Sequence, residues 1–139
     1  MIEITEDYVS FEIAKLLKEK GFDEECACLY DDVELGTPGL EVNGYIRSIN
    51  SSLDDNQYAA PTLQMAMKWL REVHNIHIEL NWDKGNQLYS FQIWKPRKYQ
   101  PEISSLDLWR IYKDDNYPGE WKYEEACEIA IKYCLKNLI

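Results

Sequence analysis

The pattern of apolar and polar residues changes its period near the middle of the chain. Over residues 62–74 apolar side chains recur every three or four positions, which predicts an amphipathic helix. Over residues 76–82 apolar and polar side chains alternate, which predicts a strand with one buried face. Asn75 stands between the two segments, and asparagine can adopt the left-handed backbone conformation that ends a helix. A helix is therefore expected to lead directly into a strand.

A second alternating segment, 88–94, follows a polar stretch and predicts an antiparallel hairpin with residues 76–82. A four-residue loop over 83–86 places Leu80 opposite Tyr89 and Ile78 opposite Phe91. Sliding the pairing by one residue would move the apolar side chains to opposite faces, so the pattern selects the face that is buried. The residues expected on that face are Ile76, Ile78, Leu80, Tyr89, Phe91 and Ile93.

Two further segments, 11–20 and 123–138, have the apolar period of helices that bury one face. Ser10 is suited to cap the first helix, because a serine hydroxyl accepts a hydrogen bond from a free N–H of the first turn. Gly21 is suited to end it in a Schellman motif, because glycine adopts a positive φ without strain. The first helix therefore has local sequence signals at both ends in addition to its apolar period.

The remaining segments give weaker signals. Residues 26–35 and 40–49 are expected to contain strands, residues 51–58 to form a polar loop, and residues 106–112 to form a short helix. The sequence thus predicts an α+β fold, in which about three helices pack mainly on one face of a small antiparallel sheet. A chain of 139 residues is expected to form a single domain, 1–139.

Charge narrows the range of partners. The net charge is −10, although residues 61–100 carry 6 basic and 3 acidic side chains. Overall acidity opposes non-specific attraction to phosphates, so nucleic acid is not an expected partner. The N-terminus lacks the basic start and apolar run of a secretion signal, and no apolar stretch is long enough to cross a membrane. We expect a cytoplasmic protein whose partner is another protein or a second copy of itself.

Three blocks of the sequence, in this order, resemble a known protein family. The blocks are Ser10–Phe22, then Ala60–Thr62 leading to Trp69–Glu72 and Asn75–Ile78, then Tyr123–Ala126. They are similar to small uncharacterised proteins encoded in bacterial genomes and in their phages and prophages. The resemblance covers about half of the chain. It implies a mobile-element setting, and it implies no activity, cofactor or catalytic residue.

Four residues have the side chains of a tetrahedral zinc site, namely Cys26, Cys28, His74 and His77. Their spacings differ from those of structural zinc sites, in which paired cysteines are usually separated by two to four residues. The alternative is that both cysteines lie in the core and both histidines lie at the surface. All four cysteines of the chain are more simply explained as small buried apolar residues in a reducing compartment.

Recognisable enzyme motifs are absent from the sequence. It contains neither the nucleophile elbow of a hydrolase nor a glycine-rich phosphate loop, and no cofactor is expected. Two alternatives to an interaction protein nevertheless stay open. One is an acidic inhibitor that imitates nucleic acid and binds a DNA-processing protein, and the other is a small enzyme that depends on a metal or on a Cys/His pair.

Aromatic residues are abundant, with 18 Phe, Trp and Tyr side chains in the chain. Tyr and Trp often anchor protein interfaces, because each combines a large apolar surface with a polar group. The favoured function is therefore a non-enzymatic protein-interaction domain. The residues predicted to make the contact are Trp94, Trp109, Tyr112, Tyr117 and Trp121. The alternative is that these rings fill the core.

Overall fold

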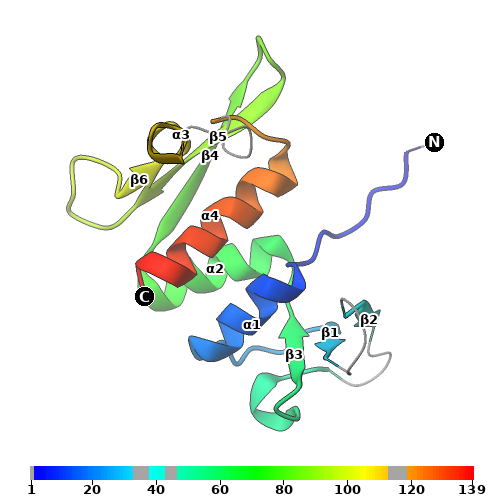
Figure 1. Cartoon of the computed structure of the whole chain (residues 1–139). Helices are drawn as coiled ribbons and strands as arrows, with labels where there is room; N and C mark the ends of the chain where they lie inside the picture. Colours follow the sequence, from blue (N-terminus) through cyan, green and yellow to red (C-terminus); the bar gives the residue numbers. More distant parts are fainter. Residues whose placement is uncertain (1, 33–37, 43–46, 113–118) are drawn as a thin grey trace. The chain divides into compact units, whose positions relative to one another are not determined.

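A computed structural model describes residues 2–32, 38–42, 47–112 and 119–139 (Figure 1). It confirms the predicted α+β class. The described residues form four α-helices and two three-stranded sheets, where about three helices and one sheet were predicted. The chain divides into two compact units: the N-terminal unit comprises residues 1–66 with Ile139, and the C-terminal unit comprises residues 67–138. That residues 1–139 form one domain stays a prediction.

The first helix of the N-terminal unit has the ends that its sequence predicts. Helix α1 spans Phe11–Glu19, and the Ser10 hydroxyl accepts a hydrogen bond from the Ile13 N–H. Gly21 has a φ of 91°. Its N–H donates to the Lys18 carbonyl, and the Phe22 N–H donates to the Leu17 carbonyl at 2.9 Å. This pair of bonds is the Schellman ending, and it satisfies carbonyls that the helix itself leaves free.

The sheet of the N-terminal unit has the order β2-β1-β3, with both pairs antiparallel. Its strands are β1 (Cys28–Asp31), β2 (Leu40–Val42) and β3 (Gln57–Ala60). The expectation of a loop over 51–58 was therefore wrong at both ends, because the 3-10 helix η1 (Asn50–Ser52) and strand β3 enter that segment. Strand β3 was missed because four residues are too few to show a clear alternation.

The C-terminal unit holds the second sheet, with the order β4-β5-β6 (Figure 1). Helix α2 (Leu63–His74) begins in the N-terminal unit and ends in this one. The next residue, Asn75, has a φ of 55°, the left-handed conformation that the sequence predicts. The other elements of this unit are β4 (His77–Asp83), β5 (Leu88–Trp94), β6 (Ile103–Ser104), α3 (Ser105–Tyr112) and α4 (Tyr123–Asn137).

The hairpin has the predicted faces but a different register. Leu80 pairs with Phe91 and Trp82 pairs with Tyr89, two positions from the predicted pairing. The loop is 84–87 because Asp83 stays in the strand, where its carboxylate accepts a 2.8 Å hydrogen bond from the Gly85 N–H. This hydrogen bond from Gly85 is also the largest cause of a lowered pKa of the Asp83 carboxyl, and a hydrogen bond with the Glu120 side chain is the next. A shift of two keeps each side chain on its face, so the alternation does not distinguish the registers.

Helix α4 packs against the hairpin within the C-terminal unit and covers its apolar face (Figure 1). Phe91 is fully buried, and the Trp121 ring stacks on it with centroids 5.9 Å apart. Helix α4 buries one face, as its apolar period predicts. The residues of that face are Ala126, Cys127, Ala130, Ile131, Cys134 and Leu135.

Candidate functional site

The four residues of the zinc hypothesis are divided between the two units. Cys26 and Cys28 are buried in the N-terminal unit. In the C-terminal unit the His74 ring packs edge-on against Trp69, and its buried Nε2 has no hydrogen-bond partner among the described residues. His77 is exposed, and its Nε2 lies 2.9 Å from the Asn75 side-chain oxygen. Within the described part of the chain, no three His, Cys, Asp or Glu side chains gather as a metal site requires.

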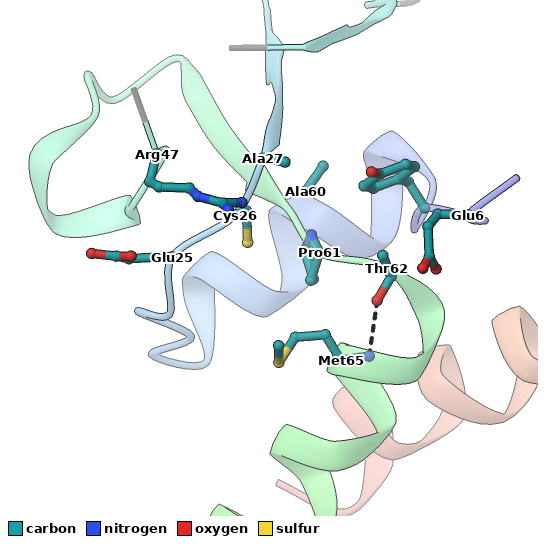
Figure 2. Close-up of a pocket in the computed structure, with 10 residues that line it drawn as sticks. Glu6, Glu25, Cys26, Ala27, Arg47, Ala60, Pro61, Thr62 and Met65 are labelled. Atoms are coloured by element: carbon teal, nitrogen blue, oxygen red, sulfur yellow. Dashed lines mark hydrogen bonds between the residues drawn. The ribbon is translucent and has the colours of Figure 1, made fainter. Parts of the chain in front are cut away.

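A pocket of about 210 Å³ lies beside Cys26 in the N-terminal unit (Figure 2). Arg47 extends toward Cys26, and Glu6 and Glu25 also line the pocket. Burial raises the pKa of the Cys26 thiol to about 12, with smaller contributions from Cys28 and Glu24, although the Arg47 charge opposes the shift. The thiol therefore stays protonated at neutral pH, which is unfavourable for a cysteine nucleophile.

All four cysteines are expected to resist modification in the folded protein. Each is buried, as the sequence predicts, and burial also raises the pKa of Cys134 to about 12. Because the thiolate is the reactive form, we expect an aromatic disulfide reagent at pH 8 to label the native chain slowly and to label four thiols rapidly in denaturant. One thiol that reacts fast and stoichiometrically in the native chain would contradict this assignment.

The predicted aromatic contact residues have different environments. Trp109 is 44% exposed on α3, whereas Trp121 is 6% exposed and fills the core, as the alternative interpretation holds. Trp94 is half-buried at the end of β5, and its indole N–H donates to the Glu79 carboxylate at 2.9 Å. Tyr112 is the last residue of α3, and Tyr117 lies outside the described residues. Among the three tryptophans of this set, whose side chains the structure describes, Trp109 is the ring best placed to contact a partner.

A capping box holds the start of α3. The Ser104 N–H donates to the Asp107 carboxylate at 3.0 Å, and the Asp107 N–H donates to the Ser104 hydroxyl at 3.3 Å. Ser105 and Leu108 are buried on the inner side of the helix, each 2% exposed. These contacts fix the rotation of α3, so the side that faces solvent is determined.

The solvent-facing side of α3 is mainly apolar. Leu106, Trp109 and Ile111 are 48%, 44% and 65% exposed, and Arg110 lies among them. We call these four residues the α3 face. Sequence reasoning named only Trp109 of the four. The spacing of Leu106 and Trp109 opposite Leu108 was the available signal, but a helix of eight residues is too short to show which side is buried.

A groove of about 350 Å³ lies next to the α3 face, with Leu106 in its wall. Its floor includes Asn81, Ser90 and Gln92 from the polar face of the hairpin. No hydrogen bond joins these three side chains to another described residue, so they are available to a bound molecule. An apolar centre beside polar groups that can form hydrogen bonds is the usual composition of a protein interface.

Among the helices in the described residues, none is long and apolar enough to cross a membrane. No family model matches the chain, and comparison with curated proteins and with solved structures likewise found no match.

Proposed function

We propose that this chain is a non-enzymatic protein-interaction domain and that the α3 face provides its main contact. The observation that carries the proposal is the exposure of Leu106, Trp109 and Ile111 on one short helix with a fixed rotation. Large apolar side chains grouped at a surface are typical of binding sites, and Trp and Arg are enriched among the residues that dominate binding energy. The groove floored by Asn81, Ser90 and Gln92 supplies the polar edge of the same surface.

The setting we propose is the cytoplasm of a bacterium, with the gene in the host genome or in a prophage. It is supported by the resemblance of the three sequence blocks. The partner is a protein with a pocket able to take an indole ring. Arg110 is the one charged residue of the α3 face, and its guanidinium lies 3.9 Å from the Asp107 carboxylate on the same helix. Because the other three residues are apolar, contacts of this face should depend less on salt than those of an acidic imitator of nucleic acid.

Removing the Trp109 ring is expected to weaken partner binding on the order of 30-fold, because an anchoring tryptophan typically contributes at least about 2 kcal/mol. The tagged full chain would be used to capture partners from bacterial lysate at low and high salt, and the captured protein would then be titrated against Trp109→Ala. Binding should persist at high salt and fall in the variant.

Tyr99→Ala is the matched control, because Tyr99 is an aromatic residue of the same unit whose side chain is fully exposed, at 102%. It should bind as the wild type does. Equal binding by wild type and Trp109→Ala would reject the α3 face as the contact. Binding that disappears at high salt would instead favour the acidic inhibitor.

A further inference from the structure

The structure leaves one long strand edge open. Among the residues that the structure describes, strand β4 pairs on one side only, with β5, in the order β4-β5-β6. It runs for seven residues in unbroken register, and none of the seven is buried. Exposed edges are usually protected by lysine, proline or a bulge, because their free backbone groups can pair with another chain. Strand β4 contains none of these three, and its charged residues are Glu79 and Asp83.

The hydrogen bonds of β5 show which residues of β4 point outward. The Tyr89 N–H and C=O bond to Trp121, and the Ile93 carbonyl accepts from the Glu102 N–H at 2.6 Å, all on the side of β5 away from β4. Backbone groups alternate in direction along a strand, so Ser90 and Gln92 are the residues that bond to β4. Their partners in β4 are Asn81 and Glu79. The backbone N–H and C=O groups of Ile78, Leu80 and Trp82 therefore point away from the sheet.

We propose that two copies of the chain pair through β4, antiparallel and with Leu80 opposite Leu80 of the second copy. In this register Ile78 of each copy meets Trp82 of the other, so all three outward residues form hydrogen-bonded pairs. The half-exposed Ile78 and Leu80 and the 57% exposed Trp82 would gain apolar neighbours. The three-stranded sheets of the two copies would become one continuous sheet.

Charge selects this register over its neighbours. With Leu80 at the two-fold axis, His77 faces Asp83 and Glu79 faces Asn81, and each of these pairs occurs twice. Shifting the axis to Glu79 would place two Glu79 carboxylates directly opposite each other, and shifting it to Asn81 would place Glu79 opposite Asp83. Like charges directly opposite are destabilising in a sheet, and both shifts also lose a hydrogen-bonded pair. Asn81 also lines the groove beside the α3 face, but the main contact of that face, Trp109, lies outside β4. The two proposals have different measurements, self-association here and capture of another protein there, so either can fail without the other.

Charge changes at Asn81 test the register. Because Asn81 faces Glu79 of the second copy, Asn81→Glu should weaken dimerisation and Asn81→Lys should strengthen it, each by about tenfold over the two symmetric pairs. The Asn81 side chain is exposed and bonds to no described residue, so both variants should fold. Sedimentation equilibrium of the full chain at fixed salt would measure the dissociation constants.

Gln100→Glu and Gln100→Lys carry the same changes in net charge at an exposed site away from β4, and each should alter the dissociation constant less than about twofold. A wild-type chain that stays monomeric at several hundred micromolar would overturn the proposal. Equal changes in the dissociation constant for the Asn81 variants and the Gln100 variants would also overturn the proposal.

Cysteine cross-linking tests the two-fold axis directly. Leu80→Cys places two new thiols opposite each other with Cα atoms about 5.5 Å apart, within disulfide range. Ile78→Cys is the matched control, because its two copies are separated by four residues along the strands, about 13 Å. Mild oxidation of the folded chain with oxidised glutathione should yield a covalent dimer of the first variant only. Cross-linking of both variants to the same extent, or of neither, would reject this register.

Discussion

Replacing Phe91 with alanine is expected to lower the free energy of unfolding by about 3–5 kcal/mol, measured by chemical denaturation followed by circular dichroism. Phe91 has no exposed surface, lies at the centre of the sheet of the C-terminal unit and stacks on Trp121. Its removal loses the transfer free energy of the ring and leaves a cavity that neighbouring strands and α4 can close only in part. Domains of this size are typically stable by about 5–15 kcal/mol, so the loss is a large fraction of the total.

Trp82→Ala is the matched control for this change. Trp82 is a larger aromatic residue on the same face of the same hairpin, but it is 57% exposed. Its removal should cost only about 1 kcal/mol or less, the typical contribution of one cross-strand pair, when measured at a protein concentration too low for self-pairing. If Phe91→Ala lowered the free energy of unfolding no more than Trp82→Ala does, the assignment of the core to the Phe91 position would be contradicted.

The elements that could be predicted are those whose cause lies within a few residues. Ser10, Gly21 and Asn75 act on backbone groups close to them in sequence, and the structure places each in its predicted role. The buried face of the hairpin could be predicted equally well, because strict alternation over seven residues allows only one face to be apolar. Its register was not, because the Asp83 contact that positions the loop has no counterpart in the apolar pattern.

The short strands and the burial of individual aromatic rings are determined by residues that are far away in the sequence. Strands β2 and β6 have three and two residues, too few for any period, and each exists because a longer strand lies beside it. Trp109 follows Leu108 in the sequence, whereas Trp121 stands between Glu120 and Lys122. Trp109 is nevertheless the exposed ring, and Trp121 is the ring that stacks on Phe91. Composition could therefore suggest an aromatic contact, but tertiary packing decides which ring is exposed.

Replacing Asn50 with alanine is the second change expected to have a large effect, lowering the free energy of unfolding by about 2–5 kcal/mol. Asn50 is 7% exposed and joins two segments: its amide donates to the Phe22 carbonyl at 2.8 Å and accepts from the Ala59 N–H at 2.9 Å. Alanine removes both hydrogen bonds and leaves the Ala59 N–H without its acceptor. A buried polar group that loses its hydrogen bond costs about 1–3 kcal/mol. Chemical denaturation of the two proteins measures the difference.

Two further substitutions test whether the loss of stability comes from the hydrogen bonds of Asn50. Ser51→Ala, at the exposed next position, should change the free energy of unfolding by less than about 0.5 kcal/mol. Asn50→Asp keeps the acceptor for Ala59, but at pH 7 it places a charged oxygen against the Phe22 carbonyl. A neutral carboxyl can donate to that carbonyl, so the deficit of this variant relative to wild type should narrow as the pH falls from 7 to 4. A deficit that widens with acid, or an alanine variant as stable as wild type, would show that these two bonds do not hold β3 to the end of α1.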